Sequence, residues 1–362
     1  MDNQRVLICV NHEIVIYNFR KELVDQLLVS GYQVFISSPV GDKLEYFRNK
    51  GVHIIPVQIS RKGKNPLTDY QLYRNYLKMM KQIEPSIVLT YTIKPNIYAG
   101  YAARRLKIDY IPTITGLGAA LNKGIKSFIP NLMYKVALKK AKRVFFQNQH
   151  NLDYMKKRKM VKDNVVLVPG SGVNTEEYSY QEYPNDKELH FIFVGRVMKA
   201  KGIEEYLWLA KTIKEKYDNI NFHVMGDMEE DYTQEIEELV NKGSILYHGA
   251  QASLHDYYKM CHAIIHPSYH EGLSNVLIEA GATGRPILAS SIPGCQETFI
   301  EGKTGFGFEP NNKHDLLEKC EHFLNLSHHD KEKMGLESRK LIEAHFDRKK
   351  VVDTYMKGIK SS

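Results

Sequence analysis

The sequence predicts an α/β protein built from two Rossmann-like, doubly wound domains. Three observations lead to this prediction. Short apolar runs alternate with segments whose apolar residues recur at helical spacing. The alternation restarts halfway along the chain, after a stretch rich in glycine, proline and glutamate. The chain has 362 residues, which is long for one domain and suits two.

The first domain is predicted to span residues 1–168. Its strands are continuous apolar runs, as expected for a parallel sheet covered on both faces, and its helices carry apolar residues every three or four positions. The predicted strands are Arg5–Val10, Gln33–Ser38, His53–Val57, Ser86–Thr90, Tyr110–Thr115 and Arg143–Gln147. The predicted helices are Phe19–Ser30, Lys43–Lys50, Asp69–Ile83, Asn96–Leu106 and Phe128–Lys140.

The second domain is predicted to span residues 189–362, after a linker at 169–188. Its last helix is a candidate for packing back on the first domain. The predicted strands are Leu189–Val194, Asn221–Met225, Ile245–His248, Ala263–His266 and Pro286–Ala289. The predicted helices are Glu204–Lys216, Thr233–Asn241, Leu254–Cys261, Ser274–Thr283, Lys313–Leu324 and Lys331–Phe346.

Charge is divided unequally along the chain. The net charge is +8, but residues 1–168 hold 28 Lys and Arg against 11 Asp and Glu, whereas residues 169–362 hold 22 against 31. Such a split indicates that the first half faces something anionic. We expect no signal peptide and no membrane span, because no apolar run approaches the ~20 residues that a span requires. The four cysteines have no paired spacing, which favours buried thiols in a reducing compartment.

The most informative stretch covers residues 267–280 and reads PSYHEGLSNVLIEA. A buried run ends at His266, a turn then carries Glu271, and a helix follows with Ser274 as its expected N-cap. Helix N-termini attract anions, because their first N–H groups lack partners and the dipole is positive there. A phosphate at this helix end, with Glu271 and Glu279 accepting from hydroxyls on either side, would match the groups of a nucleotide sugar.

This stretch resembles the signature of the retaining, group 1 glycosyltransferases of the GT-B fold. Two glutamates at this spacing are by themselves usually solvated acids, but Pro-Ser-x-x-Glu-Gly and Glu-Ala after a buried strand favour the family. The resemblance covers nearly the whole chain and implies two domains facing each other across a cleft. It implies that Glu271 contacts the donor sugar and Glu279 the ribose. Gly272, Leu273, Ser274 and Asn275 are assigned to the same donor site.

A second motif, FVGRVMKAKG at Phe193–Gly202, follows the first strand of the second domain. Gly195 permits a tight turn, and Arg196 and Lys201 place two cations at the carboxyl end of the strand. A departing diphosphate needs such charge, which Arg supplies bidentately and Lys as a point charge. The motif resembles the family's Gly-Arg…Lys-Gly element; a solvated basic turn is the alternative. Gly226, after a later strand, resembles the family's glycine turn at the nucleotide pocket. We predict that Glu271, Arg196 and Lys201 are the catalytic residues.

The acceptor-side candidates of the first domain follow its strands. They are His12 and Asn18 in a loop predicted over Cys9–Phe19, Lys94 and Asn96 after the fourth strand, and Thr115 and Gly116 after the fifth. The first of these loops lacks the glycine pair that relatives carry. Thr115 stands where many relatives have a histidine that helps to hold the donor sugar. Lys-Pro-Asn elements like that at residues 94–96 recur in transferases that build capsular, O-antigen and lipid-linked oligosaccharides.

Positive charge is densest between Lys123 and Lys162, where twelve Lys and Arg accompany one acid, Asp153. Within this stretch, residues 128–140 read FIPNLMYKVALKK, an apolar face edged by lysines of the kind seen in interfacial helices. Each cation near an anionic leaflet contributes about 1 kcal/mol of attraction. The alternative is a helix that faces only the core. No nucleic-acid recognition motif accompanies the charge, so the predicted partner is an anionic membrane surface.

Together with the resemblance to the family, these observations predict a retaining glycosyltransferase at the cytoplasmic, inner face of a bacterial membrane, attached peripherally. The predicted donor is a UDP-sugar, an N-acetylhexosamine by preference, and the predicted acceptor is a polyprenyl-diphosphate-linked saccharide for a capsule or related polysaccharide. No Asp-x-Asp motif is present, so no metal and no cofactor are predicted. Two alternatives stay open: a GT-B sugar-nucleotide epimerase, and a catalytically silent partner subunit of a glycosyltransferase. Sugar identity, linkage and oligomeric state are not encoded in any recognisable motif.

Overall fold

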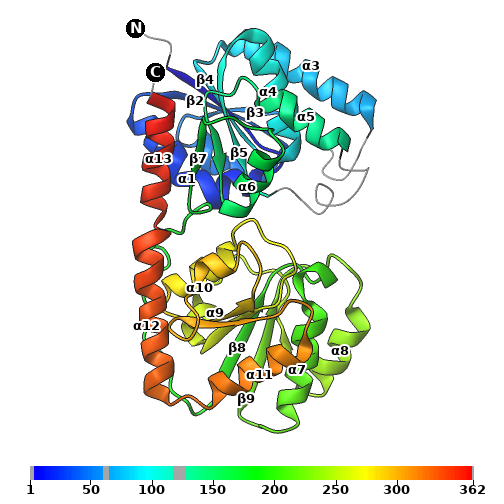
Figure 1. Ribbon diagram of the computed structural model, residues 1–362, viewed down its shortest axis with the longest axis vertical. Coiled ribbons are helices and arrows are strands. Elements are labelled where there is room, and N and C mark those ends of the chain that lie inside the picture. Colours follow the sequence, from blue (N-terminus) through cyan, green and yellow to red (C-terminus); the bar gives the residue numbers. More distant parts are fainter. Residues whose placement is uncertain (1–3, 60–64, 117–127, 361–362) are drawn as a thin grey trace. The chain divides into compact units, whose positions relative to one another are not determined.

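The chain folds into two compact α/β units (Figure 1). The computed structural model describes residues 4–59, 65–116 and 128–360. Unit 1 comprises Met1–Ser171 together with Arg348–Ser362, and unit 2 comprises Gly172–Asp347. Helices cover both faces of each sheet (Figure 1). The prediction of two Rossmann-like α/β domains is therefore confirmed.

Unit 1 contains a seven-stranded sheet in the order β3-β2-β1-β4-β5-β6-β7, with parallel pairing throughout the described strands. The strands are β1 (Arg5–Cys9), β2 (Gln33–Ser38), β3 (His53–Pro56), β4 (Ile87–Tyr91), β5 (Asp109–Ile114), β6 (Val144–Phe146) and β7 (Val165–Leu167). The helices are α1 (Glu13–Val29), α2 (Glu45–Arg48), α3 (Pro66–Ile83), α4 (Ile93–Leu106), α5 (Phe128–Leu138), α6 (Gln149–Lys157) and α13 (Arg348–Lys360).

The two faces of this sheet carry separate hydrophobic clusters, because alternate residues of a strand point to opposite sides. In β1, Leu7 and Cys9 join the cluster that contains residues of α3, α4 and α5. Val6 and Ile8 join the cluster that contains residues of α1 and α13. Both sets of side chains are fully buried, which explains why the strand reads as one continuous apolar run.

Unit 2 contains a six-stranded parallel sheet in the order β10-β9-β8-β11-β12-β13. The strands are β8 (Leu189–Val194), β9 (Ile220–Met225), β10 (Leu246–Tyr247), β11 (Ala263–His266), β12 (Ile287–Ser290) and β13 (Gly305–Phe308). The helices are α7 (Ile203–Lys214), α8 (Thr233–Asn241), α9 (His255–Met260), α10 (Asn275–Ala282), α11 (Lys313–Leu324) and α12 (His328–His345).

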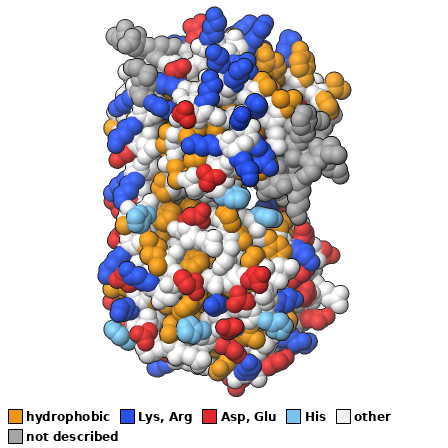
Figure 2. All heavy atoms as spheres, viewed as in Figure 1, with side chains coloured by type: hydrophobic (Ala, Val, Ile, Leu, Met, Phe, Trp, Pro, Cys, Tyr) orange, Lys and Arg blue, Asp and Glu red, His pale blue; other side chains and the backbone are white. Residues whose placement is uncertain are grey.

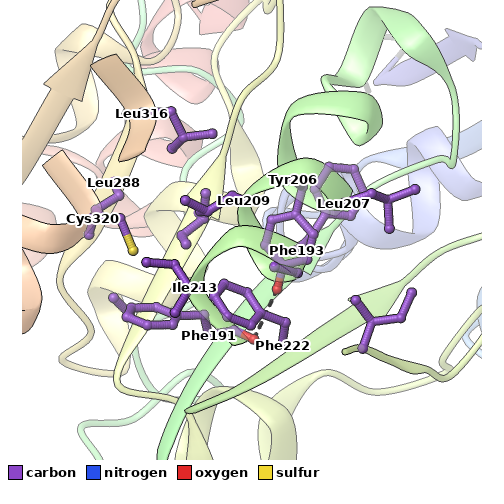
Figure 3. Packing of buried hydrophobic residues seen from close by; sticks show 14 of the residues in the cluster. Phe191, Phe193, Tyr206, Leu207, Leu209, Ile213, Phe222, Leu288, Leu316 and Cys320 are labelled. Carbon is purple, nitrogen blue, oxygen red and sulfur yellow. Dashed lines mark hydrogen bonds between the residues drawn. The ribbon is translucent and has the colours of Figure 1, made fainter. Parts of the chain in front are cut away.

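The core of unit 2 is rich in aromatic side chains that join the sheet to α7. Phe191 packs against Phe222 and Phe193 against Tyr206, with ring centroids 5.4 Å apart in both pairs (Figure 3). The buried Tyr206 hydroxyl donates to the carbonyl oxygens of Phe191 at 3.0 Å and His223 at 2.9 Å. Its polar end is thereby satisfied inside the core, and the position of β8 relative to α7 is fixed.

Each sheet reverses its strand order beside its first strand. The neighbours at the reversal are β1 and β4 in unit 1, and β8 and β11 in unit 2. In open parallel sheets, ligands bind outside the carboxyl ends of the strands at such a reversal. The loops that follow these four strands are therefore the places where a site is expected.

Four helices, α1, α3, α4 and α12, begin three or more residues before their predicted starts. Helix α1 begins at Glu13, within the predicted loop, because the His12 side chain accepts a hydrogen bond from the Ile14 N–H at 3.2 Å and caps the helix. Helix α4 begins at Ile93, because Pro95 lies in its first turn, where a missing N–H costs nothing. Strands β7 and β13 and helices α6 and α13 were not predicted as separate elements of their units.

The polypeptide passes between the two units twice, at Ser171/Gly172 and at Asp347/Arg348. The first crossing lies inside the stretch 169–188, whose later residues belong to unit 2. Helix α13 belongs to unit 1, where Tyr355 is buried and its hydroxyl lies 2.6 Å from Thr113 Oγ1. Arg348 contacts both carboxylate oxygens of Glu22 at 3.0 Å. Over the described ranges, no helix has the length and apolar character to cross a bilayer.

Candidate functional site

The loops that follow β8 and β11 lie against each other at the strand reversal of unit 2. The Tyr269 N–H donates to the Ala200 carbonyl at 3.1 Å, which joins the two loops directly. Gly202, just before α7, has a φ of +74°, and a Cβ there would lie 2.1 Å from the Pro267 carbonyl oxygen. A side chain at this position would force the loops apart, so this glycine permits their close approach.

Gly195 and Gly226 form a second close contact at the same edge of the sheet. The Gly195 N–H donates to the Met225 carbonyl at 2.9 Å. Gly226 has a φ of +149°, and a Cβ on it would lie 1.7 Å from the Gly195 carbonyl oxygen. Because the contact is with backbone, no side chain could be accommodated there by a small shift. Gly226 therefore holds the ends of β8 and β9 together.

Lys201 and Glu271, two of the three predicted catalytic residues, form an ion pair. The Lys201 Nζ lies 2.5 Å from Glu271 Oε1, and the two side chains are 20% and 13% exposed. His266, the last residue of β11, places its Nε2 2.9 Å from the same oxygen and is 2% exposed. Two nitrogen donors thus converge on one carboxylate oxygen in a largely buried place.

The environment keeps the Glu271 carboxylate ionised. Burial by itself raises the pKa of this carboxyl, but the hydrogen bond from His266 and the charge of Lys201 outweigh burial, so the pKa lies well below its ordinary value. Beside it, burial and the Glu271 charge raise the pKa of the Cys295 thiol. Glu271 is therefore an anionic hydrogen-bond acceptor at neutral pH, suited to hydroxyl groups.

Arg196 does not join this pair. Its side chain is 51% exposed, and its Nη1 lies 3.7 Å from Glu229 Oε2. It follows β8 directly, so it remains at the ligand-binding edge of the sheet. An exposed ion pair at this distance is weak, which leaves Arg196 able to exchange Glu229 for a more highly charged anion.

Helix α10 begins at the same place with no side-chain cap. Ser274 occupies the N-cap position, yet its hydroxyl makes no cap bond and instead lies 3.3 Å from His266 Nε2. The Ser274 N–H donates to the Gly294 carbonyl at 2.8 Å. Because no side chain caps the first turn, this helix start has the features of an anion site. Asn275, the first helical residue, buries an amide oxygen that has no partner among the described residues.

The other donor-side candidates have clear surroundings. Glu279 lies one turn further along α10, and its Oε2 accepts from the Tyr258 hydroxyl at 3.2 Å. Leu273 is buried in a cluster with Val173 and Ile278, so it anchors the loop. Gly272 packs against Gly294, where a Cβ would lie 2.7 Å from the Gly272 carbonyl oxygen.

The candidates in unit 1 are mostly engaged within that unit. His12 caps α1, and Asn18 is exposed on the same helix. Lys94 Nζ lies 2.7 Å from Asp69 Oδ1. Thr115 and Gly116 are half-buried after β5.

Asn96 differs from its prediction as an acceptor-side residue, because its side chain points into the fold. It is 1% exposed, accepts from Thr90 Oγ1 at 2.7 Å and donates to the Thr113 carbonyl at 2.8 Å. As a residue of the first turn of α4 it faces the sheet, and its amide joins β4 to β5. Asn96 therefore supports the loop that carries Lys94.

Sequence reasoning assigned neither His266 nor Gly294 to the site. A signal for His266 was available, because a histidine that ends a buried strand directly before the motif is placed at the ligand-binding edge. Gly294 has a φ of +89°, but its contact with the motif is purely tertiary. The described residues contain no group of three or more His, Cys, Asp or Glu side chains arranged to hold a metal.

Helix α5 presents two kinds of surface. Tyr134, Ala137 and Leu138 are buried in unit 1, whereas Leu132 is 50% and Val136 37% exposed. Exposed lysines lie on α5 or directly after it (Lys135, Lys139 and Lys140) and at the end of α6 (Lys156 and Lys157). Lys123 and Lys126, and the side chains of Phe128 and Ile129, lie outside the described residues. In Figure 2, Lys and Arg side chains gather over unit 1, and acidic side chains are more frequent over unit 2.

Comparisons with known proteins give a consistent result. Residues 174–341 match the family "Glycosyl transferases group 1", and residues 5–148 match "Glycosyl transferase 4-like". The chain is 25% identical to the N,N'-diacetylbacillosaminyl-diphospho-undecaprenol alpha-1,3-N-acetylgalactosaminyltransferase of Campylobacter jejuni, over 84% of this chain and 85% of that protein. It is 26% identical to the capsular polysaccharide biosynthesis glycosyltransferase CapM of Staphylococcus aureus, over 96% and 94%.

Solved structures share the fold, as two examples show. A glycosyltransferase from Rickettsia africae superposes with a TM-score of 0.80 at 18% identity, covering all of both chains. An Anabaena protein in complex with UDP-glucose superposes with a TM-score of 0.79 at 14% identity, over 99% of this chain and 100% of that one. The fold is that of the GT-B structures.

Proposed function

This chain belongs to the retaining group 1 glycosyltransferases, and from that premise we propose its donor and its acceptor. It transfers a sugar, an N-acetylhexosamine, from a UDP-linked donor to a saccharide carried on a polyprenyl diphosphate. The donor binds to unit 2, and the acceptor is held by unit 1. The product enters the synthesis of a bacterial capsule or related surface glycan.

The pairing of Lys201 with Glu271 is the observation that carries the donor site. A lysine and a glutamate that are 70 positions apart meet at 2.5 Å, at the strand reversal where this fold class binds ligands. The uncapped start of α10 adjoins the pair. Cations for phosphates and carboxylates for hydroxyls are thus available in one place, as a nucleotide sugar requires.

The residues have separate roles in the proposed reaction. Arg196 and Lys201 meet the negative charge that develops on the departing diphosphate, which is the stage at which fixed cations lower the barrier most. Glu271 accepts from a hydroxyl of the donor ring, and Glu279 accepts from the ribose. The acceptor hydroxyl attacks the anomeric carbon as the bond to phosphate breaks, and its proton passes to the departing phosphate oxygen. No protein nucleophile is required.

The choice of donor and acceptor rests on the names of relatives. The Campylobacter protein is named for the transfer of N-acetylgalactosamine to a sugar on undecaprenyl diphosphate. The Staphylococcus protein is named for capsule synthesis, and the Anabaena structure contains UDP-glucose. These names support a UDP-sugar donor and a lipid-linked acceptor for this chain.

A lipid-linked acceptor requires unit 1 to approach a membrane, and its surface supports such an approach. Leu132 and Val136 are exposed one turn apart on α5, with Lys135, Lys139 and Lys140 around them. Apolar side chains can enter the headgroup region while lysines attract anionic lipids. We propose peripheral attachment to the anionic inner face of the cell membrane through this surface.

Two assays in sequence test the function. A thermal-shift screen of nucleotide sugars should give its largest stabilisation with a UDP-N-acetylhexosamine. Transfer from that donor to a synthetic polyprenyl-diphosphate saccharide should follow, with retention of anomeric configuration. A nucleotide sugar recovered with an altered sugar and no transfer would indicate an epimerase. A protein that binds a donor but neither hydrolyses nor transfers it would be a silent subunit.

A further inference from the structure

We propose that His266 is a positioning residue of the donor site, which holds Glu271 by one oxygen and presents the other to the sugar. The proposal rests on the function proposed for Glu271. His266 ends β11, and its ring is 2% exposed, so it cannot itself reach a ligand from solvent. Its Nε2 lies 2.9 Å from Glu271 Oε1.

The position of the ring proton follows from the surroundings of the two ring nitrogens. Nε2 faces a carboxylate oxygen, which only accepts, so Nε2 must carry hydrogen. Ser274 Oγ, 3.3 Å from the same nitrogen, can share that hydrogen as a second acceptor. Nδ1 is buried and has no hydrogen-bond partner among the described residues. A ring with its hydrogen on Nε2 therefore satisfies every neighbour that the structure places around it.

The consequence for Glu271 is a carboxylate with two different oxygens. Lys201 Nζ lies 2.5 Å and His266 Nε2 lies 2.9 Å from Oε1. Oε2, in contrast, has no partner within the described part of the chain. Two donors to Oε1 fix the plane of the carboxylate. The lone pairs of Oε2 then point in a fixed direction. A hydroxyl of the donor sugar would find a preorganised acceptor, which is how a binding site avoids the cost of ordering its own groups.

His266 also allows Lys201 to serve both the diphosphate and Glu271. Lys201 must approach the departing diphosphate, and any movement toward it weakens the contact with Glu271. The hydrogen bond from His266 keeps Glu271 ionised and oriented while Lys201 moves. Without His266, the same buried carboxylate would depend on Lys201 alone, and it would gain a proton or lose its orientation.

The test compares two substitutions at one position. His266→Leu removes the donor, whereas His266→Gln keeps an N–H the same number of bonds from Cβ as Nε2. In the leucine variant we expect donor hydrolysis to fall at least tenfold in kcat/KM, with the acid limb of the pH profile moved to higher pH. His266→Gln should restore most of the wild-type kcat/KM and most of the wild-type pH profile. The control is His329→Leu, at an exposed histidine of α12, and it should behave like the wild type.

A second readout does not depend on turnover. The Glu271 carboxyl carbon, identified by its loss in Glu271→Gln, can be titrated by ¹³C NMR in the full chain. Its pKa should rise in His266→Leu and return in His266→Gln. An unchanged titration in the leucine variant overturns the role of His266, whatever the protein does with nucleotide sugars. The expected titration together with no activity on any nucleotide sugar would instead refute the proposed function and leave the role of His266 in holding Glu271 intact.

Discussion

The two units have the same strand order around their first strands but differ in what they present to their surroundings. Unit 1, residues 1–171 and 348–362, holds 33 Lys and Arg against 12 Asp and Glu, whereas unit 2 holds 17 against 30. Unit 1 has 3 histidines and unit 2 has 12. One topology therefore carries two surfaces of opposite charge. The strand order determines only where the ligand-binding edge of the sheet lies, and the side chains determine the chemistry at that edge.

The loops at the two strand reversals show the same contrast. In unit 1, His12 caps a helix and Lys94 pairs with Asp69, so polar side chains there support local structure. In unit 2, Ser274 does not cap its helix, and Lys201, Glu271 and His266 gather beside it. Buried ion pairs add little to stability, so a charged cluster beside an uncapped helix indicates a function. Four variants or conditions test this contrast.

The largest effect is expected from removing the charges at the unit 2 site. Lys201→Ala or Arg196→Ala should lower turnover by ~10²-fold or more, the scale for losing one preorganised transition-state donor. Lys199→Ala is a matched control, because Lys199 lies in the same turn, is exposed and pairs with Glu204. Steady-state kinetics of donor hydrolysis decide the matter. Near wild-type kcat/KM in both alanine variants would remove these residues from the mechanism.

Charge reversal on unit 1 should abolish membrane binding while sparing the unit 2 site. Changing Lys139, Lys140, Lys156 and Lys157 to Glu removes about 4 kcal/mol of attraction, or ~10³-fold in partitioning onto anionic vesicles. Hydrolysis of the nucleotide sugar should persist. The matched control changes four exposed lysines of unit 2, namely Lys187, Lys211, Lys242 and Lys333. Co-sedimentation with anionic vesicles at wild-type level would show that the basic surface is merely solvated.

Acid should destabilise unit 2 before unit 1. Burial, then the neighbouring histidines, lowers the pKa of His223 to about 3, and burial lowers that of His262 to about 4. In the unfolded chain these histidines take up protons near pH 6.5. Their contribution to the free energy of unfolding is therefore fully present above that pH, and it decreases steadily as the pH falls toward 4. Hydrogen exchange measured at pH 7.5 and at pH 5 should show that the lower pH reduces protection in unit 2 peptides more than in unit 1 peptides. The loss in unit 2 should be smaller in His223→Gln. Earlier loss in unit 1 peptides would contradict this.

The smallest effect is expected from metal removal. The chain has no Asp-x-Asp motif, and Arg196 and Lys201 are the cations proposed for the diphosphate. Activity should therefore change less than twofold in EDTA, as measured by donor hydrolysis. Loss of activity that Mg²⁺ or Mn²⁺ restores would assign the leaving group to a metal instead.

The periodicity of the sequence was sufficient for the two-unit fold, because each buried strand and amphipathic helix is encoded locally. The pairing of Lys201 with Glu271 could also be anticipated, since both follow strands that meet at one sheet edge. Three features could not. The start of α1 depends on a capping histidine, the burial of Asn96 depends on the sheet beneath it, and β13 reads Gly-Phe-Gly-Phe, a composition that does not indicate a strand.

The return of α13 to unit 1 has a consequence for synthesis on the ribosome. Val351, Tyr355 and Ile359 are part of the unit 1 core, and they are translated after the whole of unit 2. Domains usually fold in the order in which they emerge. Here the unit that emerges first cannot complete its core until α13 has followed unit 2 out of the ribosome. A stop codon before α13 would therefore remove core residues from the unit that is translated first.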